Sequence, residues 1–137
     1  MAQIIAYLSF NGNCREAMSF YRDILGGELR MQSVGETPVA GQMPAEAHQK
    51  IMHALLTGNG FVLMASDSLR GNLTEGSSIS LLLSCSGEEE INRLFSGLSS
   101  GGNVTEPLND TFWGARFGAL KDKFGISWML NFEKPKS

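Results

Sequence analysis

Histidine titrates near neutral pH and often carries acid–base chemistry, and this chain of 137 residues has two histidines, His48 and His53. His53 lies in an apolar segment with the length of a strand, so its ring faces one side of a sheet. If the turn at 58–60 has two central residues, His53 pairs with Ser66 and shares the face of Met64; with three, it faces the other way. His53 is the candidate acid–base residue, and a structural histidine satisfied by a neighbouring hydroxyl or backbone group is the alternative.

A second group of side chains could bind a planar or anionic molecule. Trp113 and Arg116 lie close together in the chain, and arginine beside aromatic rings suits a carboxylate, a phosphate or a flat ligand. Trp128 is different, because alternation along its strand turns it to the face opposite Met129, and we expect Trp128 to lie in the core. Trp113 and Arg116 are therefore candidate ligand-binding residues, at the mouth of a cavity or at a subunit interface.

Two cysteines, Cys14 and Cys85, are too far apart in the chain for a C-x-x-C pair. Cys14 is expected at the start of a helix, where the helix dipole lowers the pKa of a thiol, so it is a weak candidate nucleophile. Two unpaired thiols are typical of a protein from a reducing compartment, which predicts a cytoplasmic location.

Composition excludes several classes of protein. The chain has 11 basic and 14 acidic residues, a net charge of −3, and no basic run of the kind that attracts nucleic acid. No apolar run approaches the roughly 20 residues that span a bilayer, and no basic segment precedes an apolar one as in a signal peptide. We expect a protein that handles small molecules and has no nucleic-acid or membrane partner.

The first half of the chain reads as strand–helix–strand–strand–strand. Asn13 and Glu16 have the spacing of a helix capping box, and Gly26-Gly27 ends the helix. A long loop at 35–49, with two prolines, precedes a β-hairpin. The expected elements are strands at 4–10, 28–34, 51–57 and 61–66 and a helix at 14–25.

The second half repeats this order. Ser86 and Glu89 have the capping-box spacing again, and Gly101-Gly102 ends the second helix, 75 residues after the first glycine pair. The expected strands are at 79–84, 104–108, 117–121 and 126–132. The repeat predicts one pseudo-symmetric domain over 1–137, with module one at about 1–70 and module two at about 77–135.

Three groups of segments match a known family: 7–14 with Phe20-Tyr21, 52–54 with 65–67, and, most specifically, 111–114 with 122–129. Through them, and through the paired modules, nearly the whole chain resembles the PhnB-like group of the vicinal oxygen chelate superfamily. Glyoxalase I, bleomycin-resistance proteins and extradiol dioxygenases belong to that superfamily. The resemblance implies an α+β fold in which the two modules form one cup-shaped, partly open barrel with a cavity between them. It also implies a homodimer.

The same resemblance implies where a metal would bind. Metal-using members take one His, Gln or Glu from the first and last strand of each module, and the matching positions in this chain are Ala6, Met64, Ser80 and Met129. An alanine cannot bind an ion and a thioether binds hard divalent ions poorly, and sliding the match by one residue brings in no better ligand. We therefore predict no divalent metal at this position and no cofactor.

Three classes of function remain: a small-molecule binding protein, a metal-independent enzyme such as a lyase or isomerase with His53 as acid or base, and a dimeric module with a filled cup. We predict the first, with the ligand unidentified, and keep the enzyme as the alternative. The predicted ligand-binding residues are Ala6, Leu8, Phe10, Met64, Ser80, Trp113, Arg116 and Met129.

Overall fold

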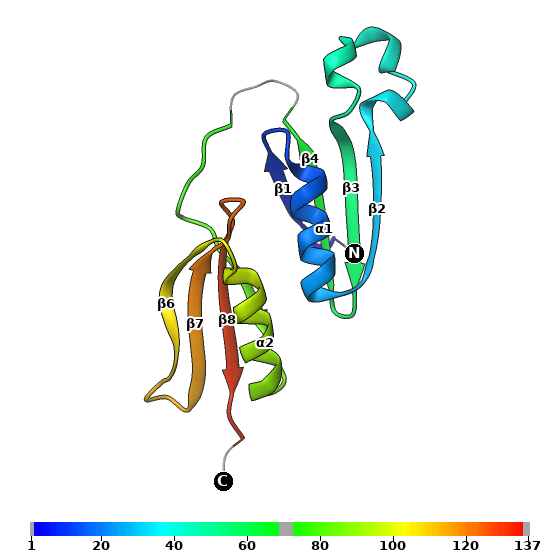
Figure 1. The fold of residues 1–137 in the computed structure, drawn as a ribbon. Helices are drawn as coiled ribbons and strands as arrows, with labels where there is room; N and C mark the ends of the chain where they lie inside the picture. The colour runs from blue at the N-terminus through cyan, green and yellow to red at the C-terminus, as the bar shows by residue number, and fades with distance from the viewer. Residues whose placement is uncertain (1, 69–72, 136–137) are drawn as a thin grey trace. The chain divides into compact units, whose positions relative to one another are not determined.

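The computed structural model describes residues 2–68 and 73–135, and the chain divides into two compact units, Met1–Thr74 and Glu75–Ser137. The boundary falls between the two predicted modules. Each unit has its own four-stranded mixed sheet and its own helix, so we describe the two units one at a time (Figure 1). The prediction that the modules combine into a single domain stays a prediction.

The first unit has its strands in the order β1-β4-β3-β2, with β1 parallel to β4 and the other pairs antiparallel. Its elements are β1 (Ala6–Phe10), α1 (Cys14–Leu25), β2 (Glu28–Ser33), β3 (Ile51–Gly58) and β4 (Phe61–Asp67). The predicted long loop between β2 and β3 contains three single 3₁₀ turns, Val34–Glu36, Ala40–Gln42 and Ala45–Ala47. Within this loop the Nε2 atom of His48 lies 2.7 Å from the carbonyl oxygen of Ala40, so His48 is a structural residue.

The second unit repeats the topology as β5-β8-β7-β6, with β5 parallel to β8. Its elements are β5 (Leu81–Ser84), α2 (Glu88–Ser99), β6 (Asn103–Asp110), β7 (Ala115–Lys121) and β8 (Ser127–Glu133). The predicted α+β class and the repeated order of elements are confirmed, and neither sheet closes into a barrel by itself.

Each helix covers one face of its own sheet, and the core of the unit lies between them. In the first unit α1 lies over one face of the sheet (Figure 1). Met18 and Tyr21 of α1 and Phe10 of β1 are buried. In the second unit Ile91 and Leu98 of α2 are buried in the same way. The opposite face of each sheet, which we call the helix-free face, carries no helix of its own unit.

Trp128 lies in the core, as predicted. Its side chain is 2% exposed, and its indole Nε1 donates a 2.8 Å hydrogen bond to Oδ2 of the buried Asp122. The other carboxylate oxygen of Asp122 accepts bonds from the backbone N–H groups of Phe124 and Ile126, so this aspartate organises the β7–β8 turn.

The capping predictions at both helices need correction. The side chain of Asn13 makes no capping bond; instead, the backbone N–H of Cys14 donates to Oδ1 of Asp67 at the end of β4. At α2 the carboxylate that reaches back to the N–H of Ser86 comes from Glu90, one residue later than expected, because the helix begins at Glu88. Three-residue spacing alone cannot tell which carboxylate or which strand end lies nearest a helix start.

Candidate functional site

The β3–β4 hairpin decides which face His53 occupies. Gly58 pairs with Phe61 and Leu55 with Met64, so the turn has two central residues. Continuing this register by one step places His53 opposite Ser66, on the face of Met64. The first of the two predicted alternatives is therefore correct, and His53 lies half-buried on the helix-free face.

The neighbours of His53 in the sheet are also polar. On β2 it is paired with Gln32, and on the other side Ser66 is paired with Ser9 of β1. Because directly paired residues share a face, Ser9, Ser66, His53 and Gln32 form one polar row across all four strands. The adjacent row contains Tyr7, Met64 and Leu55, and Arg30 of β2 lies at its end.

In β1, three of the predicted ligand-binding residues lie on the side of the sheet that the helix covers. Leu8 and Phe10 are 9% and 2% exposed and lie in the core beneath α1, and Ala6 is paired with Leu63 on this same side of the sheet. Alternation therefore gives the helix-free face to Tyr7 and Ser9. The tyrosine and the serine that alternate with apolar residues indicated this orientation. The predicted ligand-binding residues of β1 were the apolar ones instead.

In the second unit, the predicted residue Met129 does lie on the helix-free face. It is 38% exposed and is paired with Leu82 of β5 and Ala119 of β7. Leu82, at 59% exposed, is a larger apolar surface than Met129 on this face. Ser80 is exposed but precedes β5, so it lies at the margin of the sheet.

An open groove of about 570 Å³ lies against this face of the second unit. Met129, Ala119 and Phe117 form its floor, and Phe112 and Trp113 belong to its rim. The remaining lining residues come from β6 and the turn after it: Thr105, Glu106, Pro107, Asn109, Asp110 and Thr111. The volume lies within the range of small-molecule sites.

The aromatic rim belongs to the tip of the β6–β7 hairpin. Phe112 is 98% and Trp113 is 60% exposed, and their rings meet edge to face with centroids 5.0 Å apart. The tip is held by Thr111, whose N–H donates to the carbonyl of Ala115 at 2.7 Å and whose Oγ1 accepts from the N–H of Ala115 at 3.0 Å. The hairpin thus keeps two large aromatic side chains exposed on a hydrogen-bonded turn.

Arg116 does not line the groove that Trp113 lines, so the structure separates these two candidate ligand-binding residues. Its Nε donates to Oδ1 of Asn92 on α2 at 3.3 Å, so it points to the helix side of the sheet. Its Nη1 lies 3.4 Å from Oδ1 of Asp110, and Lys134 lies 2.8 Å from the same oxygen. The hydrogen bond from Lys134, and then the bond and charge of Arg116, lower the pKa of Asp110.

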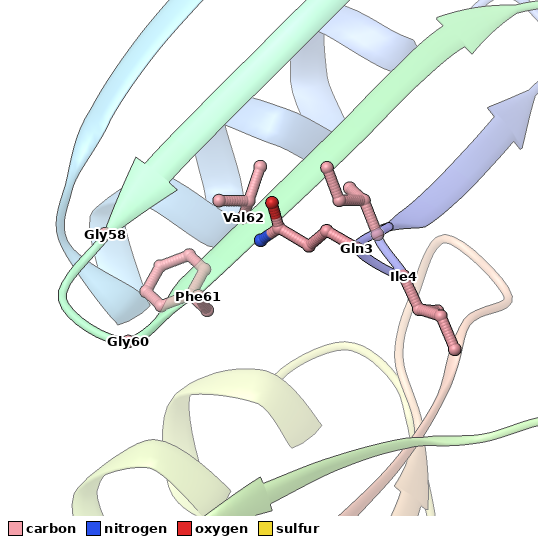
Figure 2. A pocket seen from close by; sticks show the side chains of 7 residues that line it. Gln3, Ile4, Gly58, Gly60, Phe61 and Val62 are labelled. Carbon is pink, nitrogen blue, oxygen red and sulfur yellow. The ribbon is translucent and has the colours of Figure 1, made fainter. Parts of the chain in front are cut away.

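A second hollow, of about 470 Å³, lies beside the β3–β4 turn in the first unit. Figure 2 shows the side chains of Gln3, Ile4, Phe61 and Val62 around it, with two turn glycines contributing backbone. No titratable side chain lines this hollow, so it offers packing and amide contacts and no acid–base group.

The metal positions do not fit a divalent ion. Ala6 faces α1, Met64 and Met129 present thioethers on the helix-free faces, and Ser80 lies outside its strand. Among the described residues no group of three or more His, Cys, Asp or Glu side chains is arranged to hold an ion. The donor set is therefore unsuited to hard cations, and the absence of a metal stays a prediction.

Cys14 is not an activated nucleophile. It is completely buried, and this burial, with the nearby Asp67 carboxylate, raises its pKa to about 12. Burial likewise raises the pKa of Cys85 to about 11. The expected effect of the helix dipole on Cys14 is smaller than the cost of placing a thiolate in the core.

Residues 2–131 of this chain match the family model described as 3-demethylubiquinone-9 3-methyltransferase. Protein YjdN of Escherichia coli is 36% identical, over 93% of each chain. Protein PA1353 of Pseudomonas aeruginosa is 44% identical, with 98% of this chain and 100% of that chain covered and a TM-score of 0.88. A Bacillus cereus protein named as a putative 3-demethylubiquinone-9 3-methyltransferase, PhnB protein, is 32% identical, with 96% and 99% covered and a TM-score of 0.76.

The fold extends to more distant proteins. A glyoxalase/bleomycin resistance protein/dioxygenase from Nocardioides shares 18% of its sequence with this chain, with 100% of this chain and 87% of that chain covered and a TM-score of 0.57. This likeness concerns the fold alone, and it agrees with the predicted superfamily.

Neither α1 nor α2, the helices of the described residues, is long and apolar enough to cross a membrane.

Proposed function

Because this chain belongs to the family described as 3-demethylubiquinone-9 3-methyltransferase, a PhnB-like group with the glyoxalase/bleomycin-resistance fold, we propose that it binds a small organic molecule without the superfamily metal. The binding surface would be the helix-free faces of its sheets. The family description names a methyltransferase, but the proposal rests on the chemistry of these faces and not on that name.

The observation that carries the proposal is the composition of the helix-free faces. Tyr7, Leu82 and Met129 are 53%, 59% and 38% exposed there, although each lies in the middle of a strand. Exposed apolar side chains in the strands of a sheet cost solubility unless they bind something. On the helix-free face of the first unit, which carries Tyr7, the polar row containing His53 and Ser66 could orient a ligand.

The two central methionines support a site without a metal. Met64 and Met129 occupy equivalent strands of the two units, on the helix-free faces. Thioether side chains are flexible and polarizable and adapt to apolar ligands, whereas they bind hard divalent ions poorly. A ligand held here would be bound by packing and hydrogen bonds, with no electrophilic metal needed.

The alternative function is a metal-independent lyase or isomerase that uses His53 as acid or base. Its support is the polar row, because Ser66 and Gln32 on either side of His53 could orient both the imidazole and a substrate. In such an enzyme His53→Ala would abolish turnover and retain binding. In a binding protein the same substitution would weaken binding and there would be no turnover to lose.

A thermal-shift screen tests the proposal. Chelator-treated protein is melted with a small-metabolite library and, separately, with Ni²⁺, Zn²⁺, Mn²⁺ or Fe²⁺. We expect a saturable rise in melting temperature with one class of metabolite and none with the ions. A saturable shift with a divalent ion at low micromolar concentration would overturn the metal-free reading and favour glyoxalase- or dioxygenase-type chemistry.

The homodimer and the cytoplasmic location remain predictions of the sequence and its family. Sedimentation of the full chain tests the first, with a particle of twice the mass of one chain expected at micromolar concentration.

A further inference from the structure

The charged side chains that line the groove of the second unit are all negative. Its two charged lining residues, Glu106 and Asp110, are both acidic, and every other lining residue is neutral. A ligand that enters this groove therefore meets negative charge and no positive charge from the lining itself. This favours a cation over an anion.

The carboxylates of Asp110 and Glu106 differ in their ion pairs with neighbouring side chains. Asp110 is bound by Lys134 at 2.8 Å and by Arg116 at 3.4 Å, and neither of these cations lines the groove. Glu106 makes no ion pair with the described residues. It is paired with Ala119, and so it lies on the helix-free face beside the floor of the groove. Glu106 is thus the charge that remains for a ligand.

The rest of the groove suits a flat molecule. Trp113 and Phe112 present their rings at the rim, and Phe117 adds a third ring to the floor. Aromatic faces attract both flat rings and positive charge, and the attraction is strongest for tryptophan. The hydrogen bonds between Thr111 and Ala115 order the backbone of the hairpin tip that carries Phe112 and Trp113, which reduces the entropy lost on binding.

We propose that this groove binds a planar organic cation, with Glu106 pairing with the positive charge and Trp113 stacking on the ring. The inference deepens the proposed function and rests on it, because it names the class of ligand for one of the helix-free faces. The charge would lie over β6 and the ring system over Met129 and Phe117.

The test compares two dyes of the same shape. 9-Aminoacridine is a cation at pH 7.5, whereas acridine is neutral at that pH, and both are titrated calorimetrically into the full chain. We expect 9-aminoacridine to bind about tenfold more tightly, because only the cation gains the carboxylate and the cation–π contact. Equal affinities of the two dyes would overturn the inference.

Variants locate the binding. Glu106→Gln should weaken 9-aminoacridine about fivefold and leave acridine unchanged, whereas Trp113→Ala should weaken both dyes. Trp113→Phe, which keeps an aromatic ring, should restore most of the affinity and shows that the effect is not misfolding. Glu89→Gln on α2 is the matched control, because Glu89 is an exposed acid outside the groove. Full affinity in Glu106→Gln would contradict the assignment.

The remaining outcomes separate this inference from the proposed function. If neutral molecules bind in a Trp113-dependent way and cations bind no better, the charge argument is wrong and the binding function stands. If neither dye binds and no library compound stabilises the protein, both are wrong. If neither dye binds and Phe112→Ala converts a dimer to a monomer, the groove is an interface between two copies, which also overturns the inference.

Discussion

Asp67 shows how one buried carboxylate can connect three segments of the chain. It is 3% exposed, and its two oxygens accept the backbone N–H groups of Cys14 at 2.9 Å and Ile51 at 2.8 Å. These bonds tie the end of β4 to the start of α1 and to the start of β3. The sequence alone could not show this role, because the two partners are 53 and 16 residues away in the chain.

Asp67→Ala should therefore reduce the free energy of unfolding by about 2–4 kcal/mol, because it leaves two buried N–H donors without an acceptor. Urea denaturation monitored by circular dichroism measures the change. Asp23→Ala is the control: its carboxylate is exposed in α1 and, among the described residues, forms an ion pair with its neighbour Arg22, so the expected loss is below about 1 kcal/mol. Similar losses for the two variants would show that the Asp67 bonds contribute little.

The buried thiol of Cys14 gives a prediction about pH. Its pKa in the folded chain, about 12, is higher than the ordinary value of 9.0, so the unfolded chain loses this proton first as the pH rises. The contribution of Cys14 to stability is therefore complete below about pH 9 and decreases from there towards pH 12. We expect Cys14→Ala to flatten the decrease in the melting temperature over this range. A decrease as steep as in the unmodified chain would show that other groups cause it.

At the scale of elements, the connection from α1 to β2 depends on a close backbone approach. Gly26 and Gly27 both have positive φ, +79° and +104°. A Cβ at Gly27 would lie 2.6 Å from the carbonyl oxygen of Thr57 at the end of β3, whereas a Cβ at Gly26 would meet nothing within 4 Å. The glycine pair thus ends the helix, as predicted, and also lets the chain pass against β3.

These two glycines form a matched pair for mutation. Gly26→Ala should cost about 1 kcal/mol of unfolding free energy, the usual strain of a side chain at positive φ. Gly27→Ala should cost clearly more, about 2 kcal/mol or above, because backbone atoms block its Cβ. Chemical denaturation of the two variants compares them directly. A loss at Gly26 equal to that at Gly27 would mean that the contact with Thr57 is relieved by a small backbone shift.

The order of elements could be predicted from the sequence because local signals agree with it. Apolar runs of strand length and a glycine pair after the helix recur in both halves, and a glycine-containing turn joins the last two strands of each half. It was harder to predict which side chains of each strand point toward the helix. Trp128 was placed correctly because the face of Met129 determines the face of its neighbour on β8. In β1 large side chains point to both faces, and pairing with β4 decides which face is buried. Likewise Arg116 and Trp113 are close in the chain, and only the hairpin geometry separates them.

At the scale of the whole molecule, we propose that a small molecule is held on the helix-free faces without a divalent metal. The methionines report on this claim, because Met64 and Met129 lie on these faces, whereas Met18 is completely buried beneath α1. Labelling the methionine methyl groups with ¹³C therefore gives each surface its own NMR signal.

The most direct measurement is the methyl spectrum of the labelled protein in EDTA, recorded with mixtures of small organic molecules. We predict that at least one mixture shifts the signal of Met64 or Met129 in a saturable way and leaves that of Met18 in place. Shifts confined to Met18, or shifts at Met64 and Met129 that require an added divalent ion, would contradict the account.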